Sequence, residues 1–561
     1  MTAVLEAATA PGTGRRTRLR RAAAHVLLGN WTGASTVPSR ALYPHQWSWD
    51  SAFVAIGLRH LAPRRAQREL ETLLGAQWGD GRIPHIIFNP SVPLGAYFPS
   101  PDFWRSSGTD RERGAPSTVE TSGIVQPPVQ ALAAWLVHLA DPAESRRRGF
   151  LPRVYPRLAA WHRYLATSRD LGGGGLAAVV HPWEPGLDNS PSWDAALARV
   201  EPAPRDSFRR ADLDHGSPAD RPTDLDYARY VRLAATYRDH GYDDARTPHA
   251  FAVEDPCFNA LLIASEHALA AIARGVGADE ETHRRRAEAA TGALLDRLWD
   301  PAAGIFLPRD LVTDERVPGY GVSGLAPLIV PGLPEEVAAA LVRTARGPRF
   351  RLGEVQLVPS YDLTAAEFDG NRYWRGPSWF NTAWLVHRGL VRHGETGAAG
   401  RLRAQVLDAA HRTGFAEYVE PYTGEGRGIR RFSWTAALAL DLLDAPGDDR
   451  SEDTYGNGGS GGTSQDTYGN DAPGATSEEK LFGGAPENGP SEEDLFRAPE
   501  NGSSEDDLSG GASRSVPEGV RENVREDARE NVRESVSEDV PESVREGAPG
   551  GGSGEEEGSA R

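Results

Sequence analysis

Apolar stretches with helical spacing alternate with loops rich in Gly, Pro, Trp and Tyr along most of this 561-residue chain. The pattern runs from about Ala22 to Leu443, and each apolar stretch covers about 12–18 residues. Segments with the period-two pattern of strands are scarce. About a dozen helices in one domain predict an all-α fold of paired helices closed into a barrel, because a simple bundle does not need so many aromatic loops. Such loops at one barrel mouth are where a binding site is expected.

Eleven stretches are the candidate helices. They cover residues 51–61, 63–76, 127–139, 154–168, 224–239, 256–275, 279–298, 334–345, 377–393, 397–413 and 433–443. Asp255 stands before Pro256, the pattern of an N-cap followed by proline at the first helical position. We therefore expect three regions: a disordered segment over residues 1–24, the helical domain over 25–444, and a tail over 445–561.

The tail has the composition of a disordered, acidic, low-complexity segment. It repeats DTYGN at residues 453 and 466 and APENG at residues 485 and 498. It holds 10 Lys and Arg against 29 Asp and Glu, a net charge of −19, whereas the whole chain carries −18. The folded part is thus nearly neutral, which argues against a nucleic-acid partner. We expect the tail to be dispensable for folding and activity.

Three observations predict a cytoplasmic protein without a membrane partner. Cys257 is the single cysteine, so no intrachain disulfide can form. The basic cluster near the N-terminus is followed by an apolar patch too short for a secretory signal. No apolar run approaches about 18 residues, the length that spans a membrane.

Two loop segments combine aromatic side chains with isolated acids. In YPHQWSWDSAF, residues 43–53, two tryptophans lie next to Asp50, which suits sugar binding but equally an aromatic helix start with Asp50 as its cap. In HPWEPGLDNSPSWD, residues 181–194, Asp188 has a tryptophan on either side. Apolar surroundings raise a carboxyl pKa toward that of a general acid, so we favour a catalytic Asp188 over a helix cap.

Two further segments have the same character. Residues 361–384 crowd aromatic side chains around Arg375 and a Gly-Pro turn, where Arg375 either orients a carboxylate or stacks on a ring. Residues 415–437 offer Glu417, Glu420 and Glu425, the last in a glycine-rich turn. Paired carboxylates among aromatic rings indicate glycoside hydrolysis. Signatures for nucleotides, metals and serine nucleophiles are missing, so we expect no metal and no cofactor.

At these segments the chain resembles the mannosylglycerate and glucosylglycerate hydrolases, which belong with glycoside hydrolase family 63 and are distantly similar to trehalases. The resemblance covers about residues 25–444. It rests on five motifs in the family's order: YPHQWSWDSAF, SGIVQPPVQ, HPWEPGLDNSPSWD, RYWRGPSWFN and TGEG…FSWTAA.

The resemblance implies an (α/α)6 barrel and hydrolysis of a small α-glycoside with inversion. Carried over by position, Asp188 is the general acid and Glu417 the general base, with Glu425 in reserve. Arg221 and Tyr227 match the positions that hold the glycerate carboxylate. The sugar subsite is implied to contain Tyr43, Trp47, Trp49, Asp50, Gln126, Trp183, Tyr373, Trp374 and Trp379.

Three alternatives stay open at this point. The first is an α-glucosidase or trehalase-like hydrolase for a neutral oligosaccharide, in which Arg221 would pair with Asp224 or Asp226 on the surface. The second is a non-catalytic sugar-binding barrel, and the third is an epimerase or lyase on the same fold. The sequence leaves the sugar, the oligomeric state and the role of the tail undetermined.

Overall fold

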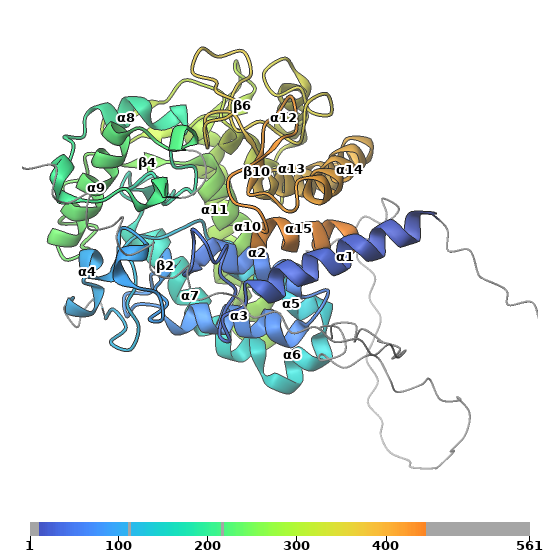
Figure 1. Ribbon diagram of the computed structural model, residues 1–561, viewed down its shortest axis with the longest axis horizontal. Coiled ribbons are helices and arrows are strands. Elements are labelled where there is room, and N and C mark those ends of the chain that lie inside the picture. Colours follow the sequence, from blue (N-terminus) through green and yellow to red (C-terminus); the bar gives the residue numbers. More distant parts are fainter. Residues whose placement is uncertain (1–10, 110–113, 215–217, 445–561) are drawn as a thin grey trace, which may run out of the picture. The chain divides into compact units, whose positions relative to one another are not determined.

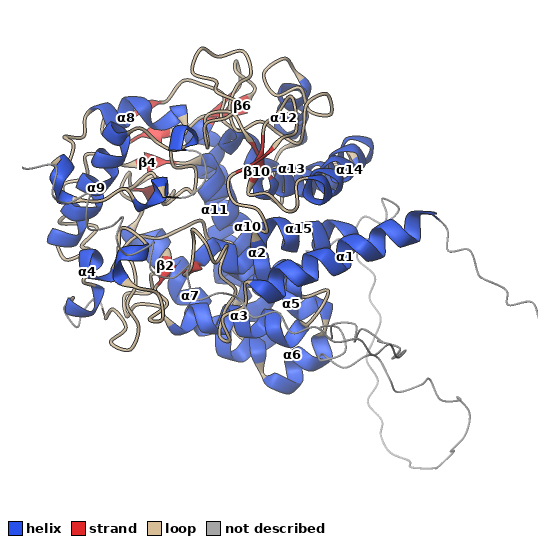
Figure 2. Cartoon of the chain, in the orientation of Figure 1, coloured by secondary structure: helices blue, strands red, loops and turns tan. Residues whose placement is uncertain are grey.

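The computed structural model describes residues 11–109, 114–214 and 218–444 of the chain, and the predicted acidic tail at 445–561 lies outside the described residues (Figure 1). Helices dominate this part, and its strands are two residues long (Figure 2). The all-α prediction is confirmed at this level.

Six elements contact one another in a closed order, each packing on the next and the last returning to the first. We call them the inner elements. They are α2 (Ser48–Leu58), α5 (Gln130–Ala140), α10 (Pro256–Val276), η7 (Val322–Ile329), α13 (Phe380–Arg392) and α15 (Ser433–Asp444).

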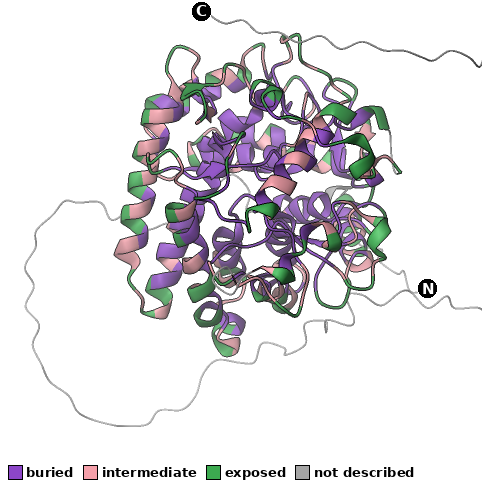
Figure 3. Ribbon diagram, turned by 90° about the vertical axis from the view of Figure 1, so that its left-hand side faces the viewer, coloured by how far each residue is buried: buried purple, intermediate pink, exposed green. Residues whose placement is uncertain are grey.

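Each inner element has a second helix against it, which we call its outer partner. In the same order the partners are α3 (Pro63–Gly75), α7 (Phe150–Ser168), α11 (Glu280–Leu298), α12 (Glu335–Arg346), α14 (Thr396–Arg412) and α1 (Pro11–Gly29). The inner helices are buried almost all round, whereas the outer helices bury one face (Figure 3).

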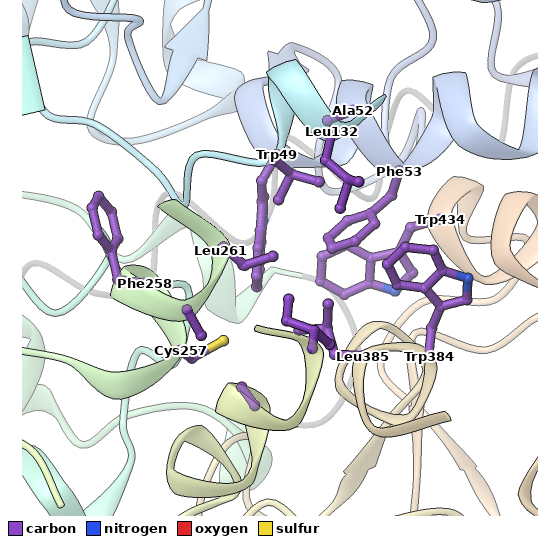
Figure 4. Packing of buried hydrophobic residues seen from close by; sticks show 14 of the residues in the cluster. Trp49, Ala52, Phe53, Leu132, Cys257, Phe258, Leu261, Trp384, Leu385 and Trp434 are labelled. Carbon is purple, nitrogen blue, oxygen red and sulfur yellow. The ribbon is translucent and has the colours of Figure 1, made fainter. Parts of the chain in front are cut away.

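The inner helices approach closely where small residues meet. A Cβ atom on Gly57 of α2 would lie 2.3 Å from the carbonyl oxygen of Ala437 on α15. This contact brings Trp49 and Trp434 together, with ring centroids 5.4 Å apart in an edge-to-face arrangement. Both rings belong to one hydrophobic core with Phe53 and Trp384 (Figure 4).

Short helices and strands occupy the connections. The remaining α-helices are α4 (Pro101–Trp104), α6 (Pro142–Arg148), α8 (Asp194–Ala198) and α9 (Asp224–Asp239). The 3-10 helices are η1 (Leu94–Ala96), η2 (Ser106–Gly108), η3 (Pro191–Trp193), η4 (Arg205–Ser207), η5 (Ala211–Leu213) and η6 (Pro218–Asp220).

The strands form four small antiparallel sheets. The first pairs β1 (Gln46–Trp47) with β2 (Ile86–Ile87), in register Trp47 to Ile86. The second orders β11 (Gly426–Arg427), β10 (Tyr418–Val419) and β9 (Ser378–Trp379). The third orders β3 (Ala178–Val179), β4 (Val253–Glu254), β7 (Arg309–Asp310) and β8 (Glu315–Arg316), and the fourth pairs β5 (Trp299–Asp300) with β6 (Ile305–Phe306).

The N-terminal boundary of the expected domain needs correction. We expected disorder up to residue 24, but α1 begins at Pro11. Leu19, Ala23, Val26 and Leu27 recur at helical spacing and are buried, because α1 is the outer partner of α15. The arginines between these apolar residues made the helical spacing difficult to recognise in the sequence.

The predicted helices otherwise differ from the observed ones mainly at their ends. The cap at Asp255 is confirmed, since its side chain accepts a hydrogen bond from the Phe258 amide at 2.7 Å. The sequence did not predict the 3-10 helix η7, an apolar segment that contains Pro327. α10 is long and apolar enough to cross a membrane, but 89% of the relevant window is buried within the protein, as in a core helix.

Candidate active site

One pocket of about 540 Å³ gathers the motif residues from distant parts of the chain. It is lined by Pro38, Tyr43, Trp47, Trp49, Asp50, His85, Tyr97, Gln126, Trp183, Gly186, Asp188, Tyr373, Trp374, Glu417, Phe432 and Trp434. Aromatic rings and three carboxyl groups thus surround the space.

Asp188 lies in the loop between β3 and η3, which two contacts hold in place. Tyr230 on α9 donates a hydrogen bond to the backbone carbonyl of Asp188 at 2.7 Å. Gly186 has a φ of 71°, and a Cβ atom there would lie 2.4 Å from the ring of Trp49. Glycine is therefore required for the loop to lie on this tryptophan.

The carboxyl group of Asp188 is set up to carry a proton near neutral pH. Burial raises its pKa to about 7, although the positive charge of Arg221 opposes the shift. Among the described residues, no other residue donates a hydrogen bond to this carboxyl group. A carboxyl group that is desolvated and lacks donors is the form that serves as a general acid.

Glu417 directly precedes β10, and its carboxylate accepts three hydrogen bonds. Oε1 accepts from the hydroxyl groups of Tyr43 at 3.1 Å and Tyr373 at 3.3 Å, and Oε2 accepts from the Ile429 amide at 3.1 Å. Burial raises the pKa of Glu417, while Arg221 and these donors act against the rise. Hydrogen bonds to the ionised form favour it, so Glu417 suits a general base better than Asp188 does.

Arg221 lies behind the pocket wall and is 8% exposed. It donates a hydrogen bond of 2.9 Å to the hydroxyl group of Tyr43 and lies 4.9 Å from the ring centre of Tyr373. Its charge lowers the pKa of both Asp188 and Glu417. The alternative of a surface pair with Asp224 or Asp226 is wrong.

The acids near Arg221 have other partners. Asp224 pairs with Arg210 at 3.0 Å. The carboxylate of Asp226 accepts a hydrogen bond of 2.6 Å from the hydroxyl group of Thr223, which caps α9. Tyr227 on α9 is buried behind the pocket, where its hydroxyl group donates to the Phe98 carbonyl at 3.1 Å. Its ring centre lies 6.0 Å from that of Trp183.

Two other candidates lie outside the lining. Trp379 stacks on Trp374 with ring centres 4.0 Å apart and planes 2° from parallel, so it backs a pocket residue. The side chain of Glu425 is 66% exposed and lies 3.6 Å from Arg427. The structure therefore does not bring the reserve base to the pocket.

Arg375 also lies outside the lining. Its two terminal nitrogens donate hydrogen bonds to the carboxylate of Asp194, at 2.9 and 2.7 Å, so it orients a partly exposed acid outside the pocket.

Several lining residues were missed from the sequence: Pro38, His85, Tyr97, Phe432 and Trp434. His85 stacks on Trp183 with planes 9° apart, and its Nδ1 lies 2.9 Å from the Ser122 hydroxyl. Burial holds its pKa well below the usual range, so it is neutral. A lone histidine in an apolar segment carried no sequence signal. Within the described ranges, no group of three or more His, Cys, Asp or Glu side chains could hold a metal ion.

The pocket holds the carboxyl groups of Asp188 and Glu417 among aromatic rings, and only one of these two, Glu417, accepts hydrogen bonds from other described residues. This arrangement defines the class of glycoside hydrolases. Comparison with known proteins agrees. Residues 43–435 match the family described as the mannosylglycerate hydrolase MGH1-like glycoside hydrolase domain. The chain belongs to this family, and the protein is a glycoside hydrolase.

This chain covers nearly the whole length of several similar proteins. Mannosylglycerate hydrolase of Rubrobacter radiotolerans is 42% identical over 425 residues, which are 74% of this chain and 95% of that protein. Glucosylglycerate hydrolase of Mycolicibacterium hassiacum is 39% identical, covering 76% and 98%. The family 63 mannosylglycerate hydrolase of Thermus thermophilus, solved with Tris and D-glycerate, has a TM-score of 0.69 at 39% identity, covering 75% and 99%.

Proposed function

We propose that the protein hydrolyses mannosylglycerate or glucosylglycerate with inversion, using Asp188 as the general acid and Glu417 as the general base. The observation that carries the proposal is the contrast between the two buried carboxyl groups. Burial raises the pKa of Asp188 to about 7, and no other described residue donates a hydrogen bond to its carboxyl group, whereas Glu417 accepts three hydrogen bonds. Relatives named for these two substrates support it.

The reaction needs one proton transfer at each carboxyl group. The proton of Asp188 passes to the glycosidic oxygen as the bond from that oxygen to the anomeric carbon breaks. Water attacks the anomeric carbon from the opposite face, and Glu417 accepts a proton from this water. The glycerate leaves with its hydroxyl group restored, and the sugar forms with inverted configuration. Proton exchange with solvent returns both carboxyl groups to their starting states.

The sugar subsite is proposed to use the aromatic lining and two polar groups. Aromatic faces cover the apolar face of a sugar, and carboxylates and amides bind its hydroxyl groups. Gln126 is oriented because its side-chain oxygen accepts a hydrogen bond from the Trp49 amide at 3.2 Å. Asp50 is buried in the same wall, where burial and the charge of Glu417 hold its pKa well above the usual range. A protonated Asp50 can donate as well as accept.

Arg221 and Tyr227 are proposed to select the glycerate carboxylate. Arg221 supports this role because its buried positive charge acts on the electrostatics of both catalytic carboxyl groups. A guanidinium group can bind a carboxylate with two parallel hydrogen bonds. The folded part carries almost no net charge, so selection of an anion must come from such a local contact.

Product analysis tests the proposal directly. The full chain would be incubated with mannosylglycerate, glucosylglycerate, trehalose and short α-glucosides, and the first sugar anomer would be identified by proton NMR. We expect the β-anomer from one or both glycerate glycosides. Release of the α-anomer would overturn inversion. Faster hydrolysis of trehalose or a neutral α-glucoside would overturn the glycerate assignment.

The role of Arg221 is tested by comparing its effect on kcat/KM for two substrates, because Arg221 also donates to Tyr43 and its charge affects both carboxyl groups. Arg221→Ala should lower kcat/KM for any substrate. If Arg221 binds glycerate, the loss for the glycerate glycoside should exceed the loss for a neutral aryl glycoside of the same sugar by about 10-fold or more. Equal losses would overturn glycerate binding by Arg221.

We also propose that the inner elements and their outer partners form an (α/α)6 barrel with the pocket at its mouth. We further propose that the protein resides in the cytoplasm. The closed order of contacts supports the barrel. A crystal structure of residues 11–444 would test it, and an open ring would overturn it. Fractionation of the source cells would test the compartment.

A further inference from the structure

A second hollow, which we call the α1–α14 groove, lies between α1, α14 and the end of α15. It encloses about 900 Å³ and shares no residue with the catalytic pocket. Leu19, Ala404, Leu407 and Leu443 form its apolar part. Figure 1 shows α1 lying along α15. An apolar groove between two helices is a typical docking site for a short peptide segment.

The groove lining carries surplus positive charge, because it contains Arg15, Arg16 and Arg403 against a single acid, Asp408. α1 holds five arginines, at positions 15, 16, 18, 20 and 21, and no acidic residue. Arg15 pairs with Asp408 at 2.6 Å, and Arg16 and Arg20 both pair with Asp444. Arg18 and Arg21 are exposed and make no ion pair within the described part of the chain. An acidic segment would complement this surface.

The chain itself supplies such a segment at this point. Leu443 lines the groove, and Asp444 is the last residue of α15. The remainder of the chain, with its net charge of −19, continues from there. Any docking motif in it is therefore tethered beside the groove, which gives an effective concentration in about the millimolar range.

A six-residue motif occurs twice in this remainder. It reads SEEKLF at residues 477–482 and SEEDLF at 491–496, that is, Ser, two Glu, a variable residue, Leu and Phe. Between residues 477 and 496 the large apolar side chains are Leu481, Phe482, Leu495 and Phe496. The first motif begins about 30 residues after Asp444, and a chain of that length spans roughly 30 Å without being extended.

We propose that the α1–α14 groove binds one Ser-Glu-Glu-X-Leu-Phe motif of the same chain. The Leu-Phe pair covers Leu19, Leu407 and Leu443, and the two glutamates face the arginines of α1. On α14 the lining runs from Gly400 to Asp408, about 12 Å at the helical rise of 1.5 Å per residue. About four extended residues cover that distance, which matches Glu-X-Leu-Phe. Either copy of the motif can occupy the groove.

Site-specific photo-crosslinking in the full chain tests this binding. Benzoylphenylalanine would replace Ala404, an exposed groove residue, and in a matched protein it would replace Ala289, an exposed alanine of α11. Mass spectrometry should identify cross-links from position 404 to residues 477–496, at about 10-fold or more above those from position 289. Raising the ionic strength should weaken them, because the glutamate contacts are screened.

A second variant removes the motif without changing the folded part. Replacing Leu481, Phe482, Leu495 and Phe496 by serine should abolish the cross-links from position 404. Persistence of the cross-links in this variant, or equal yields from positions 404 and 289, would overturn the proposal. A mixture of 15N-labelled and unlabelled chains shows which copy is captured, and isotopically mixed cross-links would assign the groove to a second copy instead of the same chain.

Discussion

The hydroxyl group of Tyr43 lies 3.1 Å from Oε1 of Glu417 and donates a hydrogen bond to it. The same hydroxyl accepts a hydrogen bond from Arg221 at 2.9 Å, so Tyr43 links the proposed base to a buried cation. The positive charge of Arg221 therefore polarises the Tyr43 hydroxyl group and strengthens the hydrogen bond that Tyr43 donates to Glu417, although the guanidinium group itself is bound to the tyrosine. Glu417 can remain ionised in a pocket whose apolar walls favour the neutral form.

Tyr43→Phe should lower kcat/KM by about 10- to 100-fold, because a hydrogen bond to a charged group contributes about 1.5–3 kcal/mol. Loss of the donor should also raise the pKa of Glu417 and move the acid limb of the kcat/KM profile to higher pH. Tyr373→Phe is the matched control, since it removes a longer hydrogen bond of 3.3 Å to the same oxygen. An unshifted acid limb in Tyr43→Phe would contradict the role of Glu417 as base.

Asp188→Asn should cut turnover of an unactivated glycoside by about 10²- to 10⁴-fold, because the leaving oxygen loses its proton donor. A glycoside with a good leaving group needs little protonation and should be affected far less. Asp194→Asn serves as control, since this acid is partly exposed and binds Arg375 outside the pocket lining. Near-normal turnover of the unactivated substrate by Asp188→Asn would show that another group is the acid.

Activity should fall as the pH rises through about 7, because Asp188 is useful only while it is protonated and burial raises its pKa to about 7. The acid limb should reflect ionisation of Glu417, whose activity is lost as its carboxylate becomes protonated. A kcat/KM profile of the wild-type chain measures both limbs. In Asp188→Asn the alkaline limb should vanish, and its survival would assign that limb to another group.

Glu417→Gln should lose activity by about 10²-fold or more, because the attacking water no longer has a base. Glu425→Gln is the matched variant from the same segment, and its exposed side chain should make it nearly neutral. Rates on a glycerate glycoside, with circular dichroism to check folding, compare the two. The reverse order of losses would return the base assignment to Glu425.

Glu184→Gln should destabilise the fold around the acid. The buried Glu184 carboxylate accepts two hydrogen bonds from Arg169, at 2.7 and 2.6 Å, and one each from the amides of Val125 and Val180. It therefore ties the Gln126 segment to the loop of Asp188. Breaking a buried pair costs about 3–5 kcal/mol, whereas Glu395→Gln in the partly exposed pair with Arg346 should cost less than about 1 kcal/mol.

Urea denaturation measures the free energy of unfolding of both variants. Equal changes in Glu184→Gln and Glu395→Gln would show that Glu184 does not hold the two segments together.

Local sequence determined the helices and their caps, because apolar spacing and capping residues act within a few turns of chain. The cap at Asp255 was readable for this reason. Asp188 and Glu417 were readable as candidates because acids among aromatic residues are chemically conspicuous. The length of α1 was not readable, since its arginines suggested disorder and only contact with α15 explains its buried face.

Tertiary structure alone decided which side chains share the pocket. Glu417 and Glu425 stand eight residues apart in one loop segment, yet the turn through β10 and β11 buries the first and exposes the second. His85, Tyr97 and Trp434 entered the lining because their elements meet in space, which no spacing along the chain encodes. Arg221 hydrogen-bonds inward to Tyr43, whereas the nearby Asp224 pairs with Arg210. Burial and long-range contacts, and hence pKa values, are properties of the packed chain, so they could not be obtained from the residues in order.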